Sequence, residues 1–300
     1  MNKYLIIFFV CLSFIGLASF TQKATLSKQT PQELATLNNK SKVSSKIISV
    51  HSFFDIYPEL NKSSRNTLII FDIDDVLITY NDMALRPCGA HFRPTSWNGI
   101  DPKEIPYLFS IMLSESEIIL VDPLALQFVK ELENKKIKTI ALTAARTGRF
   151  GIIENAEDWR ISILEKFGFN FSSSFPQKPI IHFDNETINY SLFKNGILFL
   201  GNEKNTKGDL LVKFLTKVQW KPEKIIFIDD KMSNLTSVKL ALKKEKISFQ
   251  GYHYKGVENL PGELKEQIAE VQFSWLRKNY KWLSDAEAKK AEKCLPLLYQ

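Results

Sequence analysis

The feature that most constrains this chain is an apolar run, Thr67 to Phe71, that leads directly into Asp72-Ile73-Asp74. A short uncharged run of this kind is typical of a strand that is buried on both faces. An extended backbone places Asp72 and Asp74 on the same side, where their like charges lie close together. Because such a pair needs a cation or a shared proton, the pattern predicts a chemical site at the end of a buried strand.

Strand and helix patterns alternate along most of the chain, which predicts an α/β fold with a parallel sheet. A hairpin is indicated where Lys194-Asn195-Gly196 separates the apolar segments 188–193 and 197–200. The other expected strands are residues 67–72, 137–143, 224–229 and 247–252. The expected helices are residues 50–60, a segment that begins at Asp122-Pro123, and residues 155–167, 207–218 and 233–244.

Both ends of the chain lie outside the alternating core, which we place at residues 63–256. Residues 1–18 combine a basic start with an apolar run and small residues, as in a cleaved export signal. An uncleaved anchor is the alternative, although the run is slightly shorter than the ~20 residues of a comfortable membrane span. We interpret residues 19–62 as a polar tether and N-terminal helices, with a helix start at 30–33. Both alternatives predict export, to the periplasm or the medium. If the signal is cleaved, no stable membrane span is expected to remain.

Two further segments are expected to fold outside the core. Residues 257–300 have an amphipathic helical pattern, and their expected core anchors are Trp275, Leu276, Tyr280 and Trp282. Residues 80–120 form a connection of about forty residues, far longer than a usual strand-to-helix loop, which predicts a lid or small cap beside Asp72 and Asp74. Its side chains contact substrate or build the cap's own core and salt links; the candidates, with two arginines that follow Thr143, are Arg86, His91, Arg93, Trp97, Arg146 and Arg149.

Charge and cysteine content narrow the class of partner. The net charge of +7 comes from scattered lysines, without the basic block or aromatic alternation that nucleic-acid binders show, so no nucleic acid is expected as a partner. Only Cys88 and Cys294 remain after removal of the signal, in a compartment that permits disulfides. The two thiols pair or stay free, and the sequence leaves both alternatives open.

Four strand-end or helix-start positions are expected to converge. Carboxyl ends of adjacent parallel strands meet at the crevice where ligands bind in open α/β sheets. Three carboxylates there require a cation, and an all-oxygen set favours Mg²⁺ over Zn²⁺. Asp230 and Asn234 have an alternative role as caps of the next helix. The converging groups are Asp72 with Asp74, Thr143, Lys207 and Asp229-Asp230.

Lys207 adds an independent indication of the ligand. A positive side chain in the first turn of a helix opposes the helix dipole, so an anion nearby is expected. A bound phosphate fits, with the Thr143 hydroxyl and the Ala144 amide donating to its other oxygens. Lys204 is a rival for this role, but Gly208 and the amphipathic run that follows favour Lys207.

These residues resemble the motifs of the haloacid dehalogenase (HAD) superfamily, in the same order. Asp72-Ile73-Asp74-Asp75-Val76 is similar to the first motif, and Thr143 after a hydrophobic strand to the second. Lys207 before a helix is similar to the third motif, and Asp229-Asp230 to the fourth. The resemblance covers about residues 67–254 and looks closest to a branch of exported bacterial members. It implies a three-layer Rossmann-like core with a cap inserted after the first strand.

The resemblance also implies the roles of individual residues. Asp72 would be the nucleophile that forms an aspartyl-phosphate, and Asp74 the general acid and base. Mg²⁺ would be held by Asp72, the Asp74 carbonyl oxygen and Asp229, with Asp230 assisting. Lys207, Thr143 and the amide of Ala144 would bind the phosphoryl group.

We therefore expect an exported, Mg²⁺-dependent phosphomonoesterase that acts on a small phosphorylated substrate. A non-catalytic binding or effector protein that keeps the fold is the alternative. Such a protein is expected to lack at least one essential catalytic residue, and none is missing here. A phospho-receiver domain is a third class, but receivers carry the acidic pair on the first strand and the lysine on the last. The sequence leaves the substrate and the oligomeric state open.

Overall fold

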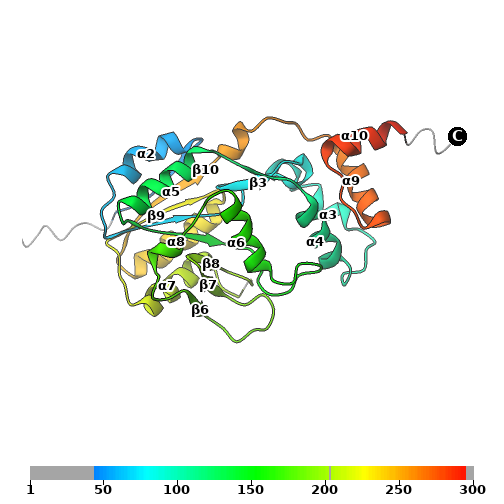
Figure 1. Cartoon of the computed structure of the whole chain (residues 1–300). Helices are drawn as coiled ribbons and strands as arrows, with labels where there is room; N and C mark the ends of the chain where they lie inside the picture. Colours follow the sequence, from blue (N-terminus) through cyan, green and yellow to red (C-terminus); the bar gives the residue numbers. More distant parts are fainter. Residues whose placement is uncertain (1–43, 203, 295–300) are drawn as a thin grey trace, which may run out of the picture. The chain divides into compact units, whose positions relative to one another are not determined.

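An eight-stranded sheet forms the centre of the part that the computed structural model describes, residues 44–202 and 204–294 (Figure 1). The strand order is β1-β10-β9-β2-β5-β8-β7-β6, and all neighbours pair in parallel except β8 with β7 and β7 with β6. The strands are β1 (Ser45–Val50), β2 (Thr67–Phe71), β5 (Lys138–Thr143), β6 (Ile180–His182), β7 (Leu192–Lys194), β8 (Ile197–Phe199), β9 (Lys224–Asp229) and β10 (Ser248–Tyr254). The predicted α/β fold and the mostly parallel sheet are confirmed.

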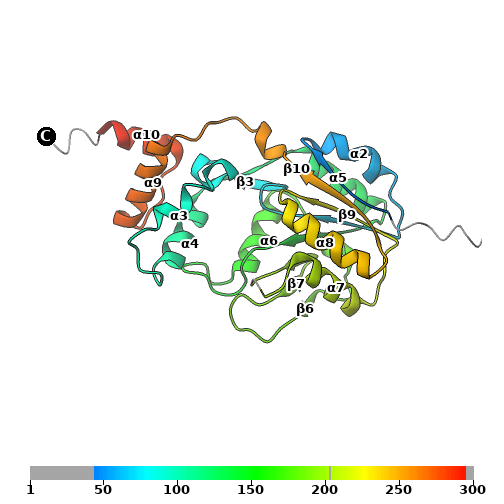
Figure 2. The ribbon, with the colours of Figure 1, turned by 180° about the vertical axis from the view of Figure 1, so that it is seen from behind.

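Helices cover both faces of this sheet (Figures 1 and 2). In β2, Ile69 and Phe71 pack on one side, whereas Leu68 and Ile70 pack on the other, as the period of two in a strand dictates. Both faces of β2 are therefore buried, as its uncharged sequence predicts. The first face is covered by α2 (Phe53–Asn61), α5 (Leu124–Asn134) and α6 (Ala156–Lys166), and the second by α7 (Lys207–Val218) and α8 (Met232–Lys244).

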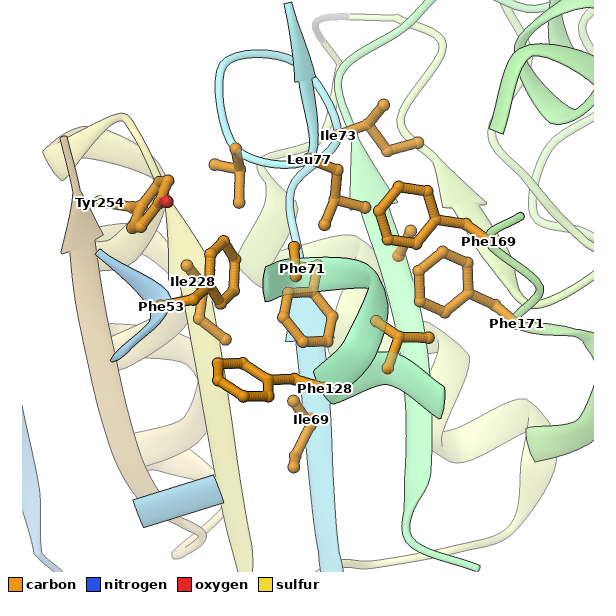
Figure 3. Close-up of a cluster of buried hydrophobic side chains, with 14 of the residues drawn as sticks. Phe53, Ile69, Phe71, Ile73, Leu77, Phe128, Phe169, Phe171, Ile228 and Tyr254 are labelled. Atoms are coloured by element: carbon orange, nitrogen blue, oxygen red, sulfur yellow. The ribbon is translucent and has the colours of Figure 1, made fainter. Parts of the chain in front are cut away.

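Aromatic rings fix the end of the central strand β2 (Figure 3). The Phe71 ring centroid lies 5.9 Å from that of Phe53 and 6.4 Å from that of Phe171. Phe53 in turn lies 4.7 Å from the ring of Tyr254. Because Phe71 directly precedes Asp72, this cluster holds the backbone from which the first carboxylate projects.

The N-terminal strand β1 differs from the expected tether and helix. Ser45–Val50 forms an edge strand beside β10, and α2 begins only at Phe53, where the Ser52 hydroxyl accepts a hydrogen bond from the Phe54 amide. Three of the six residues of β1 are exposed and only Val50 is buried, so the segment lacks the apolar alternation by which a half-buried strand is recognised.

The predicted export signal and the helix start at residues 30–33 lie outside the described residues. Among the helices between residues 44 and 294 that the structure describes, none has the length and apolar composition required to cross a bilayer.

The long connection after β2 is folded. It lies between two short antiparallel strands, β3 (Ile78–Tyr80) and β4 (Ile118–Leu120), and contains α3 (Arg93–Ser96) and α4 (Ile105–Glu115). Figure 1 shows α9 (Glu266–Asn279) and α10 (Asp285–Cys294) beside this insertion. Residues of the insertion and of the C-terminal extension share one apolar cluster, which includes Leu108, Met112, Phe273, Leu276 and Trp282. Short 3₁₀ helices cover Met83–Leu85, Pro87–Gly89, Ser172–Ser174 and Gly256–Asn259.

Two of the four expected anchors in the C-terminal extension are wrong. Leu276 and Trp282 are buried, but Trp275 is 39% and Tyr280 is 50% exposed. Trp275 precedes Leu276 by one residue, which turns it about 100° away from the buried face of α9. Tyr280 ends that helix with a φ of 52°.

The Phe71 cluster generates a stability prediction. Phe71→Ala leaves a cavity among Phe53, Phe128 and Phe171, so we expect the free energy of unfolding in urea to fall by about 3–5 kcal/mol. Phe54→Ala is the matched control, because Phe54 is 72% exposed and its truncation should have little effect. Equal losses in both variants would contradict the assigned core.

Candidate functional site

The site lies where the order of strands reverses. From β2 the chain proceeds to β5 and β8 on one side, and then crosses through α7 to β9 and β10 on the other side. Asp72 follows β2 directly, Thr143 is the last residue of β5, and Asp229 is the last residue of β9. These three side chains therefore leave adjacent parallel strands at the same edge, which is where open α/β sheets bind ligands.

Lys207 is a buried cation that joins two of these strand ends. It is the first residue of α7, and its Nζ lies 2.8 Å from Asp72 Oδ2 and 2.8 Å from Asp229 Oδ2. Burial lowers the pKa of this ammonium, but attraction to Asp229 and Asp72 outweighs burial and holds the pKa above its usual value. Lys204, the rival in sequence, is exposed and pairs with Glu186.

Local sequence fixes the position of Lys207. The preceding Thr206 caps α7: its hydroxyl accepts from the Asp209 amide, and the Asp209 carboxylate accepts from the Thr206 amide. Gly208 lies against α8 so closely that a Cβ atom would be 2.4 Å from the Ser237 carbonyl oxygen. The capping residues and the glycine thus fix the position of Lys207 at the strand ends.

Asp72 is buried at the centre of the charged groups. Its Oδ1 accepts a hydrogen bond of 2.8 Å from the Ile73 amide, and its own amide donates to the Ile228 carbonyl. Burial, followed by repulsion from Asp229, raises the pKa of Asp72 to about 7. Burial and repulsion from Asp72 similarly raise the pKa of Asp230 to about 6.

Three carboxylates are placed to hold one cation. Asp72, Asp229 and Asp230 each offer an oxygen, and these oxygens lie within 4.8 Å of one another. Asp229 already accepts hydrogen bonds from Lys207, the Lys231 amide and Asn234. By contrast, Asp230 Oδ1 is buried without a partner among the described residues. An all-oxygen set with an unpaired carboxylate oxygen fits Mg²⁺.

Asp230 is therefore a candidate direct ligand, whereas the family resemblance implies an assisting role. Its backbone carbonyl lies 2.9 Å from His253 Nε2, which steadies this position. No side chain caps α8, and the Lys231 amide just before its first turn donates to Asp229, so the alternative capping role of Asp230 does not apply among the described residues. The Asp74 carbonyl remains a predicted ligand.

Asp74 forms an ion pair that the sequence did not indicate. Arg160 Nη1, from α6, lies 2.9 Å from Asp74 Oδ1, and the arginine side chain is only 7% exposed, against 40% for Asp74. Attraction to Asp74 overcomes the effect of burial and raises the pKa of Arg160 above its usual value. The pair orients Asp74 and leaves its second oxygen available.

Thr143 and Ala144 lie where a bound anion would need hydrogen-bond donors. Thr143 is buried, and its Oγ1 accepts a hydrogen bond of 3.1 Å from the Ala145 amide. This contact leaves the hydroxyl proton of Thr143 free to donate to another group. Both Thr143 and Ala144 line the same cavity as Asp72 and Asp74.

That cavity has a volume of ≈ 360 Å³, within the range of small-molecule sites. Its floor includes Asp72, Asp74 and Thr143 from the sheet. Its roof belongs to the insertion, which contributes Leu85, Arg93, Phe109, Met112 and Leu113. The connection expected to form a lid therefore borders the carboxylates.

The arginine and aromatic candidates of the sequence divide into two groups. Arg93 and Arg146 line the cavity. Structural contacts account for the others: Arg86 donates to the carbonyl oxygens of Tyr80, Asn81 and Pro261, His91 contacts Glu266, Trp97 packs on Phe109 and Phe273, and Arg149 pairs with Glu154.

Three residues of the site were not predicted from the sequence: Asp75, Tyr80 and Arg160. Asp75 has a φ of 62°, accepts a hydrogen bond of 2.7 Å from Thr79, and has a pKa raised to about 7 by burial. Its position directly after Asp74 in the sequence could have indicated a place in the site. Tyr80 has a buried hydroxyl without a hydrogen-bond partner among the described residues, and nothing in the sequence spacing relates Tyr80 or Arg160 to Asp74.

The cysteine alternatives remain open. Cys88 is exposed, and its Sγ lies 3.5 Å from the Met83 carbonyl oxygen. The side chain of Cys294 lies outside the described part of the chain.

Similar proteins occur in species of Rickettsia and Chlamydia. An uncharacterized protein of Rickettsia prowazekii is 25% identical over 233 residues, which is 75% of this chain and 83% of that protein. One of Rickettsia felis is 35% identical over 140 residues, 45% and 47% of the two chains. A Chlamydia pneumoniae protein, provisionally named an outer membrane protein, is 24% identical over 243 residues, 76% and 84% of the two chains.

No solved structure matches the chain. Residues 49–289 match the family described as "Protein of unknown function (DUF2608)". Because this match spans most of the sequence, the chain belongs to the DUF2608 family.

Proposed function

We propose that the protein is an exported, Mg²⁺-dependent phosphomonoesterase of HAD type that acts through an aspartyl-phosphate on Asp72. The main support is the contact of Lys207 with Asp72 and Asp229 beside a third carboxylate, Asp230, next to a cavity of small-molecule size. Cation, carboxylates and cavity together suit a phosphoryl group, which needs positive charge around it and a nucleophile in line.

Phosphoryl transfer begins at Asp72. A carboxylate oxygen of Asp72 attacks phosphorus, and the bond between phosphorus and the ester oxygen breaks. Asp74, which lines the cavity and is oriented by Arg160, gives a proton to the departing alkoxide. The products of this half-reaction are the alcohol and an aspartyl-phosphate.

Hydrolysis of the aspartyl-phosphate reverses the role of Asp74. The Asp74 carboxylate takes a proton from a water molecule as the water oxygen attacks phosphorus. The bond from phosphorus to Asp72 then breaks, which releases inorganic phosphate and restores the free carboxylate. One acid–base residue therefore serves both halves of the reaction.

Other groups of the site stabilise the negative charge of the transferring phosphoryl group. Lys207 supplies a fixed positive charge, and the Thr143 hydroxyl and the Ala144 amide are positioned as donors. Mg²⁺, held by Asp72, Asp230 and Asp229, would neutralise charge on the phosphoryl oxygens when bound.

Export is supported by two observations. Residues 1–18 have the composition of an export signal. A relative in Chlamydia pneumoniae has a name that provisionally places it in the outer membrane. An exported phosphatase would meet phosphate esters outside the cytoplasm.

The nucleophile assignment predicts the effect of Asp72→Asn. An amide is a poor nucleophile, so we expect hydrolysis of p-nitrophenyl phosphate with Mg²⁺ to fall by about 10³-fold or more. Acid-quenched wild-type enzyme should carry a phosphoryl group on Asp72 by mass spectrometry. Asp55→Asn, an exposed change of the same type on α2, should retain activity. Activity that survives Asp72→Asn would refute the assignment, and tight binding without turnover in the wild type would favour the binding-protein alternative.

The double role of Asp74 predicts a burst. The nitrophenolate leaving group needs no proton, so Asp74→Asn should form the phosphoenzyme from p-nitrophenyl phosphate but hydrolyse it slowly. We expect rapid-quench kinetics to show one equivalent of nitrophenolate, followed by turnover reduced by roughly 10²–10⁴-fold. With an alkyl phosphate the burst should vanish, because that leaving group requires the acid. A uniform loss with both esters would argue against an acid–base role.

Metal binding predicts a pH-dependent gain in stability. Asp72 and Asp230 have folded-state pKa values of about 7 and about 6, above the values of the unfolded chain. The folded state therefore binds these two protons more tightly than the unfolded chain does. The stability that this provides is complete below pH ~4 and is lost as the pH rises through about 7, where the folded state also loses its protons. Mg²⁺ requires ionised carboxylates, so it should offset this loss mainly at the upper end of the range.

We therefore expect millimolar MgCl₂ to raise the thermal unfolding midpoint more at about pH 8 than at about pH 5. Calorimetry of the metal-free protein, with NaCl at equal ionic strength as control, measures this difference. Asp230→Asn should reduce the Mg²⁺ effect, whereas Asp55→Asn should not. An equal shift at both pH values, or with NaCl, would contradict the metal site.

A further inference from the structure

The cavity beside Asp72 and Asp74 has an apolar wall that the proposed phosphoryl chemistry does not use. The wall combines side chains from α4 with side chains that follow β5 and begin α6. Its principal members are Phe109, Met112, Leu113, Phe150, Ile153 and Trp159. A leaving group attached to a phosphate near Asp72 would lie against this wall.

The wall is held in a fixed shape. Phe109 and Phe150 meet edge to face, with ring centroids 5.8 Å apart and an interplanar angle of 81°. The loop of Phe150 approaches α4 so closely that a Cβ atom on Gly151 would lie 2.1 Å from Ser110 Oγ. The Ile152 amide also donates to Ser110 Oγ at 2.9 Å. A preformed aromatic wall binds a flat apolar group without an ordering cost.

Uncharged hydrogen-bonding groups of the cavity are mostly engaged within the protein. The Thr79 hydroxyl donates to Asp75, and the Asn234 amide donates to Asp229. The Thr143 hydroxyl accepts from the Ala145 amide, and its proton is the proposed donor to the phosphoryl group. Among the described uncharged side chains of the lining, only Tyr80 keeps a buried hydroxyl without a partner.

Each arginine of the lining has a contact within the protein. Arg93 donates to the carbonyl oxygens of Ala84 and Arg86, and Arg160 pairs with Asp74. Arg146 stacks on the Phe150 ring, with its guanidinium carbon 5.1 Å from the centroid. Their remaining N–H groups, including a buried Arg160 Nε without a partner among the described residues, are not part of the apolar wall. A sugar or polyol that lay against the wall would bury hydroxyls there without partners, which is unfavourable.

We propose that the substrates are phosphomonoesters of aromatic alcohols, with the ring bound against Phe109 and Phe150. This inference rests on the proposed phosphatase function and specifies its leaving group. The ring would form edge or stacked contacts with the wall, while the phosphate reaches Asp72 and the ester oxygen reaches Asp74. The buried Tyr80 hydroxyl and Arg160 Nε, both without a hydrogen-bond partner among the described residues, could serve the few polar atoms of such a ligand.

Benzyl phosphate and glycerol 3-phosphate test the inference in the wild-type protein. Both are esters of alkyl alcohols of similar acidity, so a difference in kcat/KM reflects binding of the leaving group rather than its departure. We expect benzyl phosphate to be favoured by about tenfold or more, from burial of its ring. Equal or greater activity on glycerol 3-phosphate would overturn the inference and leave the phosphatase proposal intact. Hydrolysis of neither ester would overturn both.

Two variants on α4 localise the effect. Phe109→Leu removes a ring from the wall and should lower kcat/KM for benzyl phosphate several-fold, with little change for glycerol 3-phosphate. Tyr107→Leu removes a ring of similar size that is 43% exposed, lies outside the cavity and packs on Tyr280, so it should change neither value. Circular dichroism of both variants verifies folding. Selectivity unchanged in a folded Phe109→Leu protein would contradict the assigned wall.

Discussion

A buried lysine held between two carboxylates is the interaction on which the site depends. An ammonium without water is costly unless opposite charges accompany it, and Asp72 and Asp229 provide them at 2.8 Å each. The same lysine reduces the repulsion between these two carboxylates, which come from adjacent strands. Removal of Lys207 would leave two buried carboxylates without their counter-charge, whereas removal of either carboxylate would leave the lysine with one partner. The position of α7 against the sheet is therefore tied to the charge balance at the strand ends.

The roof of the cavity depends on a different set of contacts. The helix α9 packs on the insertion and extends its apolar cluster, and α10 packs on α9. Arg86 donates to the Pro261 carbonyl, and the Trp282 indole donates to Asp82 at 2.9 Å. Segments about two hundred residues apart thus cooperate to place α4 over the carboxylates, which gives the C-terminal extension a role in shaping the site.

The ion pair of Asp74 and Arg160 joins the proposed acid to a helix that also borders the cavity. Arg160 belongs to α6, which packs on the sheet through Ile161 and Leu164 and presents Trp159 to the cavity. The helix that orients the proposed acid also contributes to the apolar wall. Proton transfer and recognition of the leaving group would therefore depend on the same element, so changes in the packing of α6 should affect both.

The sequence by itself determined the alternating α/β order, the bounds of α7 and β9, and the four motif positions at the strand ends. It did so because a strand buried on both faces, an amphipathic helical run and a hairpin signal are local patterns, and because parallel strands bring their carboxyl ends together. It missed β1, whose exposed edge position gives no apolar alternation, and it misassigned Trp275 and Tyr280, whose orientation depends on where α9 and its end lie. Only the tertiary structure decided that Arg160 meets Asp74, that Asp230 keeps an unpaired oxygen, and that Phe109 and Phe150 form one wall. Those contacts join distant segments, and no local pattern of residues encodes the distance between them.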